Sequence, residues 1–307
     1  MPNERPVVTI DLCRVRENVA KISRGCNTDV IAVVKADAYG VGAKRVAAAI
    51  AHHVAGFYTF NLDEALAADL PALGKPVIAL RGDLASVDAF IAARVRPVVW
   101  TREQAVAMQK ARPVLAVDTG QQRFACPVSH VPDIVAAGKI DEAFTHASTR
   151  MQIVEFAAAT AGLNLRRHAA GSSLLHERDA RFDAVRPGLA LYDSAVTVTL
   201  PLIDARNSIG PAGYSGFIVP RFGLISAGYS HGLRPGPASV NGRPTRILEV
   251  GMQTSFIELT EEDGTGDEVT LLGPDVPLVN IAPIWGCSQQ QVLVNLCRLG
   301  ERVYVEG

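Results

Sequence analysis

The stretch DVIAVVKADAYGVGAKRVAAAIAHHVAGFYTF, residues 29–60, sets the pattern of the fold. It opens with a β-branched apolar run at 29–35, continues through an alanine-rich segment with helical spacing at 43–55, and closes with a second apolar run at 56–60. Such alternation is typical of strand–helix–strand units around a parallel sheet. We therefore expect residues 29–60 to form one such unit.

The same pattern recurs as far as residue 192. Six further apolar runs follow: PVIAL at 76–80, RPVVW at 96–100, PVLAVD at 113–118, EAFTH at 142–146, LRRHAA at 165–170 and GLALY at 188–192. The helical candidates between them are DEALAADL, SVDAFIAA, REQAVAMQKA, VPDIVAAG and QIVEFAAATAG. Eight parallel strands with intervening helices predict an α/β fold, a TIM-like (β/α)8 barrel over residues 10–194.

The residue composition and periodicity change after Tyr192. Proline, glycine and alternating apolar positions dominate, as in PTRILEVG, TSFIELT and DEVTLLG. This pattern predicts a second, C-terminal β-rich domain over residues 195–307. Its last segment, QVLVNLCRLGERVYVEG, is expected to form a short helix followed by a closing strand.

Composition narrows the classes of ligand. The 307 residues carry 30 basic and 31 acidic side chains, so no strong global field would attract nucleic acid or an anionic membrane. The N-terminus MPNERPVVTID lacks the apolar core of a signal peptide, and no apolar run is long enough to span a bilayer, which predicts a cytoplasmic protein. Five widely spaced cysteines without a C-x-x-C pair argue against disulfides and a metal site. A small-molecule ligand is expected.

Lys35 ends the first apolar run. A lysine at the end of a barrel strand is partly desolvated, which lowers its pKa and frees the amine for a Schiff base, although a solvated lysine can occupy the same position. The surrounding stretch AVVKADAYGVG, residues 32–42, closely resembles the cofactor-lysine motif of alanine racemases. The resemblance implies that Lys35 binds pyridoxal 5'-phosphate (PLP) as a Schiff base and that Tyr39 hydrogen-bonds the cofactor phosphate.

Two further barrel segments resemble motifs of this family. VDTGQQRFAC, residues 117–126, is similar to K-V-D-T-G-M-N-R and places Arg123 on the arginine that approaches the substrate carboxylate and a cofactor oxygen. Thr145 and His146 resemble the family's Thr-His pair, whose imidazole packs against the pyridine ring. The resemblance thus assigns Arg123 to substrate and His146 to cofactor.

The stretch HAAGSSLLHERDARFDAVRPGLALY, residues 168–192, resembles the family's H-x-A-N-S-A followed by R-P-G-(I/L)-x-L-Y. It implies that Ser172 hydrogen-bonds the phosphate and that the backbone N–H groups of Gly188 and Leu189 complete the cradle. Glycine allows the backbone to approach a phosphate closely. The cradle would therefore be made largely of backbone.

The same stretch supplies the group that faces the pyridine nitrogen. Arg186 matches the family's arginine at this place, and His168 its partner in the layer behind. A permanently charged arginine does not readily protonate the ring nitrogen as a carboxylic acid would. This choice favours racemisation over transamination.

Three segments of the β-rich part also resemble family motifs: AGYSGF at 212–217, AGYSHG at 227–232 and LEVGMQTSF at 248–256. They make Tyr214 the candidate catalytic tyrosine, place Tyr229 at the active-site entrance, and put Met252 where a methionine helps to bind the substrate carboxylate. Inversion requires an acid–base group on each face of the reacting carbon. Lys35 and Tyr214 would serve the two faces.

The resemblance implies a head-to-tail homodimer with shared active sites, in which Tyr214 and Met252 act on the partner's cofactor, and a first strand at 6–9 that joins the β domain. The chain departs from the family pattern at Val41, Ala116, Gly171, Gln253 and Gln290. These changes keep other PLP-dependent reactions of this fold open: a specialised amino acid racemase, a decarboxylase or a D-amino-acid lyase. A non-catalytic PLP-binding protein is the third alternative.

Overall fold

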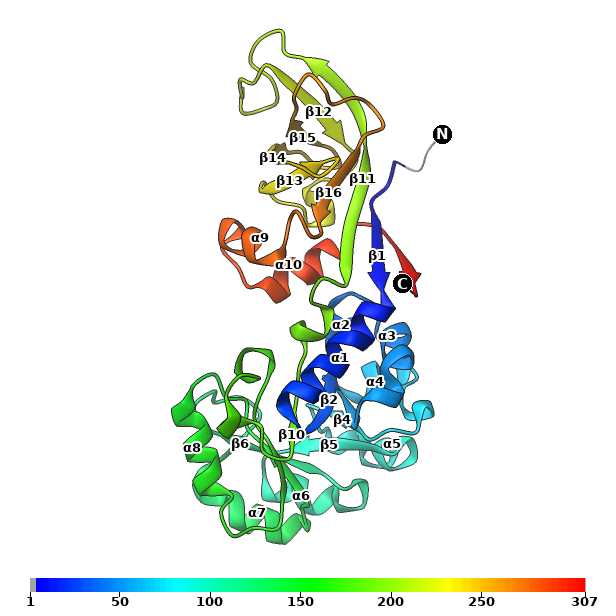
Figure 1. Cartoon of the computed structure of the whole chain (residues 1–307). Helices are drawn as coiled ribbons and strands as arrows, with labels where there is room; N and C mark the ends of the chain where they lie inside the picture. Colours follow the sequence, from blue (N-terminus) through cyan, green and yellow to red (C-terminus); the bar gives the residue numbers. More distant parts are fainter. Residues whose placement is uncertain (1–3, 307) are drawn as a thin grey trace. The chain divides into compact units, whose positions relative to one another are not determined.

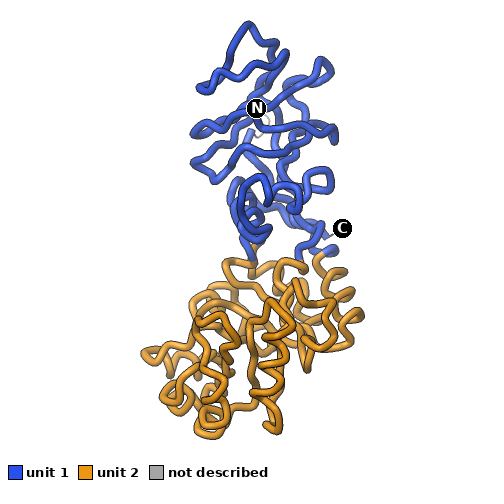
Figure 2. The backbone as a smooth tube through the Cα atoms, turned by 90° about the vertical axis from the view of Figure 1, so that its left-hand side faces the viewer, with its two compact units in different colours: residues 1–14, 39–41, 192–307 blue, residues 15–38, 42–191 orange. Residues whose placement is uncertain are grey.

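The computed structural model describes residues 4–306. The chain divides into two compact units, shown in different colours in Figure 2. The barrel unit comprises residues 15–38 and 42–191, and the β unit comprises, among the described residues, 4–14, 39–41 and 192–306. The chain crosses between the units at four places, two of them on either side of the short segment 39–41.

Within the described residues, eight parallel strands close the barrel unit (Figure 1). They are β2 (Asp29–Val33), β3 (Gly56–Thr59), β4 (Val77–Ala79), β5 (Val95–Val99), β6 (Val114–Asp118), β8 (Glu142–Phe144), β9 (Arg166–His168) and β10 (Ala184–Val185). Their order is β5-β4-β3-β2-β10-β9-β8-β6, and β6 pairs with β5 to close the ring. A two-residue strand, β7 (Cys126–Pro127), adds to β6. The predicted α/β barrel is confirmed.

The last barrel strand differs from the prediction. GLALY at 188–192 was the expected strand, but Leu189–Tyr192 is a 3-10 turn and the strand is β10, a few residues earlier. Pro187 explains the difference, because it has no N–H to continue a ladder and its ring fixes φ. Its carbonyl still accepts the N–H of Val33 at 2.9 Å. The apolar residues beyond it pack as a turn instead.

Helices lie between the strands of the barrel unit, where the spacing predicts them. They are α3 (Ala43–Ile50), α4 (Leu62–Ala67), α5 (Val87–Ala93), α6 (Arg102–Ala107), α7 (Val131–Gly138) and α8 (Arg150–Ala159). The N-termini of α6 and α8 carry capping boxes built on Thr101 and Thr149, which satisfy backbone donors that a helix start leaves free. A further helix, α1 (Leu12–Cys26), precedes β2 and buries Val15 and Val19.

The β unit is a sheet whose order is β12-β15-β14-β13-β16-β11-β1-β17. Its strands are β1 (Val7–Asp11), β11 (Val196–Asn207), β12 (Arg221–Ile225), β13 (Pro237–Val240), β14 (Arg243–Val250), β15 (Ser255–Glu258), β16 (Glu268–Leu272) and β17 (Glu301–Val305). Because β11 also pairs with β12, the six strands from β11 to β16 form a closed ring. The strand β1 lies between β11 and β17. The C-terminal β-rich domain is confirmed.

Two helices, α9 (Leu278–Trp285) and α10 (Gln289–Leu296), follow β16 and precede the closing strand β17. The short helix and closing strand expected at the end of the chain are therefore present, as α10 and β17. The sequence pattern did not predict α9, which contains Pro283. Over residues 4–306, no helix combines the length and apolar character that a bilayer crossing requires.

Candidate active site

Lys35 opens a short left-handed turn, α2 (Lys35–Tyr39), directly after β2. Ala36, Asp37 and Ala38 have φ values of 54°, 53° and 55°. A left-handed turn costs non-glycine residues about 1–2 kcal/mol each, so contacts must hold it. The carbonyl and carboxylate of Asp37 provide two, because they accept the N–H groups of Gly42 at 2.9 Å and Ala43 at 2.8 Å.

Glu64 provides the contact at the start of the turn. Its carboxylate accepts the N–H of Ala36 at 3.1 Å and the N–H of Phe60, at the end of the neighbouring strand, at 2.9 Å. Its own N–H binds the side chain of Asn61, the N-cap of α4. Glu64 therefore ties the residue after Lys35 to the end of β3 and the start of α4.

The surroundings of Lys35 favour a neutral amine. Burial lowers its pKa, the positive charges of Arg123 and Arg186 lower it further, and the carboxylate of Glu64 opposes them. A neutral lysine amine is the nucleophile that a carbonyl cofactor requires. Lys35 thus has the placement and electrostatics expected from the sequence.

Arg186 lies buried in the barrel. It donates from Nη2 to the carbonyls of Thr145 at 2.5 Å and Ala169 at 3.3 Å, and its guanidinium carbon lies 4.5 Å from the ring centre of Phe144. Burial lowers its pKa. Its Nε atom is buried and has no protein partner among the described residues. An unpaired buried donor is costly unless a ligand or water satisfies it.

His168 lies deeper in the barrel and is fully buried. Its Nε2 is 3.0 Å from Oε1 of Glu142, and its ring stacks on Phe144 at 5.6 Å. Burial lowers the pKa of His168 to about 4, so the ring is neutral and Nε2 donates to the carboxylate. The sequence paired His168 with Arg186; in the structure its hydrogen-bond partner is Glu142, and both His168 and Arg186 lie against Phe144.

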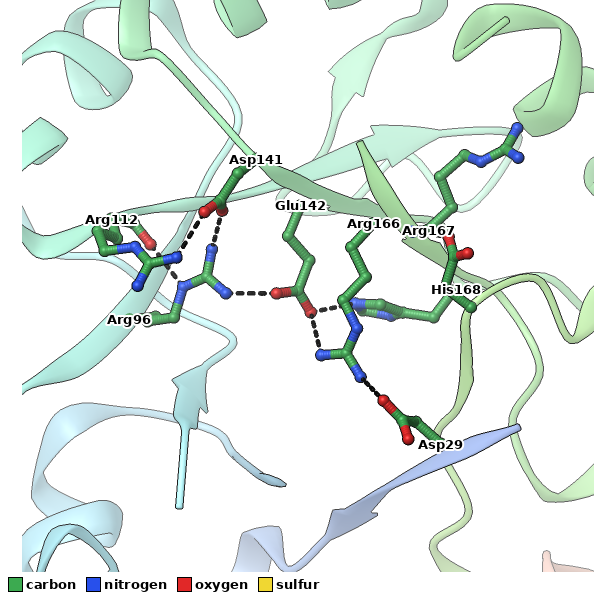
Figure 3. Close-up of polar contacts among 9 residues, drawn as sticks. Asp29, Arg96, Arg112, Asp141, Glu142, Arg166, Arg167 and His168 are labelled. Carbon is green, nitrogen blue, oxygen red and sulfur yellow. Dashed lines mark hydrogen bonds and ion pairs between the residues drawn. The ribbon is translucent and has the colours of Figure 1, made fainter. Parts of the chain in front are cut away.

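Below this aromatic layer, the amino ends of the strands hold a network of ion pairs (Figure 3). Its members are Asp29, Arg96, Arg112, Asp141, Glu142 and Arg166. Glu142 lies between Arg96 on one side and Arg166 and His168 on the other. Burial alone would raise the pKa of Glu142, but the His168 hydrogen bond and the arginine charges hold it at about 2. At this end of a barrel, such a network serves stability.

Ser172 lies beside the backbone of residues 188–190 in the barrel unit, and these are the parts expected to bind the phosphate. Ser172 Oγ accepts the N–H groups of Gly188 at 3.0 Å and of Ala190 at 3.1 Å, with Leu189 between them. Ala190 was not among the residues that the sequence singled out. Tyr39 belongs to the β unit, where its ring lies 5.7 Å from that of Tyr192, and burial raises its pKa.

Arg123 and His146 lie after the strands β6 and β8. The loop of Arg123 is held by Asp118, whose carboxylate accepts the N–H groups of Gly120 at 2.8 Å and Gln122 at 3.0 Å. Partial burial and the charges of Arg186, Lys35 and Arg123 lower the pKa of His146, so this ring is neutral. The charges of Arg123 and Arg186 thus act on both Lys35 and His146.

The remaining candidates lie in loops of the β unit. Tyr214 is 94% exposed, and Tyr229 and Met252 are also exposed. The N–H of Tyr229 donates to the carbonyl of Gly251 at 2.9 Å, and that of Ser230 to Met252 at 3.0 Å, so these two loops are joined through backbone. Glu249, which precedes Met252 by three residues, accepts the N–H of Tyr214 at 2.8 Å. The structure therefore brings the tyrosines and the methionine onto connected loops.

Residues 10–195 match the family model described as "Alanine racemase, N-terminal domain". An alanine racemase from Azoarcus sp. is 30% identical over 94% of this chain and 96% of its own length. The alanine racemase of E. faecalis has a TM-score of 0.87 and 26% identity, covering 98% of both chains. That of Bartonella henselae, solved with covalently bound pyridoxal phosphate, has a TM-score of 0.88 and 22% identity over 98% of this chain and 99% of its own.

Proposed function

The chain belongs to the alanine racemase family, and on this premise we propose that it is a PLP-dependent isomerase that interconverts L-alanine and D-alanine. The observation that carries the proposal is Lys35, a partly buried amine whose pKa is lowered, held in a left-handed turn at the end of a barrel strand. The relatives named above are alanine racemases, so the comparisons do not favour the decarboxylase, lyase or non-catalytic alternatives. The cytoplasmic location stays a prediction from the sequence.

The barrel residues fit PLP. Lys35 supplies the amine for covalent attachment, and Ser172, whose Oγ accepts the N–H groups of Gly188 and Ala190, has its hydroxyl hydrogen to donate to a phosphate. Arg186 brings a buried guanidinium whose Nε lacks a partner, as a donor reserved for a ligand would. When bound, PLP withdraws electrons from the α-carbon of an attached amino acid and so acidifies its proton.

Two groups then exchange the α-proton. Lys35 removes or returns it on one face and Tyr214 does so on the other, so that removal on one side and delivery on the other invert the carbon. Arg123, Met252 and Tyr229 bind the amino acid. Arg186 does not readily give a proton to the ring nitrogen, which would limit how much negative charge the cofactor ring accepts.

A homodimer is part of the proposal. A tyrosine that is 94% exposed in one chain needs a further surface to exclude water from the reaction, and a second copy would supply it. Ile209 and Ile218, which lie on either side of Tyr214 in the sequence, are also exposed. Sedimentation should show a dimer at concentrations where the enzyme is active. Full activity of a monomer would contradict the role of Tyr214 across the interface.

The test is to incubate the PLP-loaded protein with L-alanine in heavy water and to follow D-alanine by chiral chromatography and α-deuterium by mass spectrometry. We expect D-alanine that carries deuterium. Tyr214→Phe should reduce its formation on the order of 10²–10⁴-fold, as expected for loss of an acid–base group, and should leave covalently bound PLP unchanged. Deuterium in L-alanine without any D-alanine from the wild-type protein would contradict racemisation.

A further inference from the structure

Residues 212–217, here called the Tyr214 loop, form a closed turn between β11 and β12. The N–H of Ala212 donates to the carbonyl of Phe217 at 2.9 Å and closes its base. The ring of Phe217 packs edge-on against Phe222 at 5.6 Å and Phe256 at 5.2 Å. This aromatic cluster anchors the loop to the sheet.

One carboxylate holds the tip of the loop. Glu249 accepts the N–H of Tyr214 at 2.8 Å, the N–H of Ser215 at 2.7 Å and the hydroxyl of Ser215 at 2.5 Å. Hydrogen bonds to an ionised acceptor are about twice as strong as neutral ones. The Ser215 hydroxyl and the two N–H groups hold the pKa of Glu249 below its usual value, so these bonds persist at neutral pH.

The local backbone is shaped for this contact. Gly213 has a φ of +69°, and a Cβ atom there would lie 2.7 Å both from Oε2 of Glu249 and from the ring of Phe217. The pairing of β14 with β15 shifts register between Ile247 and Glu249. Such an irregularity re-aims the side chain that follows it. The glycine leaves room for the carboxylate, and the register shift accompanies the placement of Glu249.

We propose that Glu249, with Ser215, is the positioning residue for Tyr214, fixing the backbone from which the tyrosine hydroxyl reaches the α-carbon. The inference rests on the proposed function of Tyr214. A side chain that is 94% exposed is placed chiefly by its backbone, and the two N–H bonds to Glu249 fix that backbone on both sides of the residue. Glu249 contacts the loop and moves no proton itself.

The test uses the PLP-loaded protein with Glu249→Gln. The glutamine can accept one N–H, but its amide nitrogen faces the other donor, so the loop loosens. A displacement of about 1 Å can cost a rate on the order of 100-fold. We therefore expect inversion of alanine to fall about 10–100-fold in both directions. Exchange of the α-proton with retention, from the enantiomer that Lys35 deprotonates, should stay within about twofold of wild type.

Two further variants serve as comparisons for Glu249→Gln. Ser215→Gly removes the hydroxyl bond but keeps the N–H bond and should have an intermediate effect, whereas Glu261→Gln changes an exposed glutamate of the same unit and should have none. Equal loss of exchange on both faces, or no loss of inversion, would overturn the proposal.

Hydrogen exchange of the Tyr214 and Ser215 amides is a second readout. Glu249→Gln should remove their protection, and unchanged protection also overturns the proposal. If the wild-type protein fails to invert alanine, the proposed function fails, and the amide protection still decides the contact.

Discussion

Lys35 and Tyr214, the two proposed acid–base residues, have opposite surroundings. Lys35 is partly buried in the barrel unit, beside the charges of Arg123 and Arg186, whereas the side chain of Tyr214 is almost fully exposed. Both are nevertheless held through backbone N–H groups that donate to a glutamate: Glu64 for the turn after Lys35, and Glu249 for the Tyr214 loop. The barrel unit therefore partly buries Lys35, whereas Tyr214 would be covered only in the proposed dimer.

The largest effect should come from Lys35→Ala. Without the amine, the protein cannot bind PLP covalently and loses an acid–base group, so racemisation should fall by more than about 10³-fold and the visible absorbance of bound cofactor should disappear. Lys110→Ala, at an exposed lysine of the same unit, is the control. Tyr214→Phe should keep the absorbance, so the two variants distinguish loss of cofactor attachment from loss of an acid–base group alone. Retention of covalently bound PLP by Lys35→Ala would place the attachment elsewhere.

A large effect on stability is expected only in the barrel. Glu142→Gln removes the buried carboxylate between Arg96 and Arg166, which keep only their half-exposed acidic partners Asp141 and Asp29. Breaking a buried ion pair costs up to about 3–5 kcal/mol. Urea unfolding should show this loss, whereas Tyr214→Phe should change the unfolding free energy by less than about 0.5 kcal/mol because the ring is exposed. If Glu142→Gln left the free energy of unfolding unchanged, the network would not stabilise the barrel.

The two regions also differ in how far the sequence predicts them. Seven of the eight runs became barrel strands, and most of these strands consist mainly of buried residues; the exception is β9, which has two half-buried arginines. The run at 188–192 is equally apolar, and only Pro187 signals that the strand ends earlier. A local pattern therefore identifies a strand better than it locates its ends.

The glutamates that hold the candidate site residues show how far the sequence alone can predict the site. Asn61 and Glu64 form a recognisable helix start, N-L-D-E, so Glu64 could have been found as a cap but not as a partner of Ala36. Glu142 and Glu249 have partners 26 and 35 residues away, brought close only by strand pairing. Motifs predict the groups that would touch a ligand, and the fold decides which groups hold them.

The smallest functional effect should come from Glu64→Gln, a change in the rate of covalent PLP uptake. This variant separates the effect of the Glu64 charge from that of its hydrogen bond to the turn. Covalent uptake of PLP requires the neutral amine, so its rate rises with pH through the pKa of Lys35. The carboxylate of Glu64 raises that pKa, so its removal should move the rise to lower pH. Loss of the hydrogen bond to Ala36 should separately lower the plateau rate at high pH several-fold, because the left-handed turn loosens.

These two effects have opposite signs at low pH, which makes the comparison with Glu155→Gln, an exposed glutamate of α8, informative. Stopped-flow uptake of PLP by the cofactor-free protein, measured across pH, should show the shift and the lower plateau together in Glu64→Gln and neither in the control. A lower plateau without a shift would mean that Glu64 acts by position alone, as proposed for Glu249. A shift to higher pH would contradict the prediction, because the loss of a carboxylate charge cannot by itself raise the pKa of a neighbouring amine.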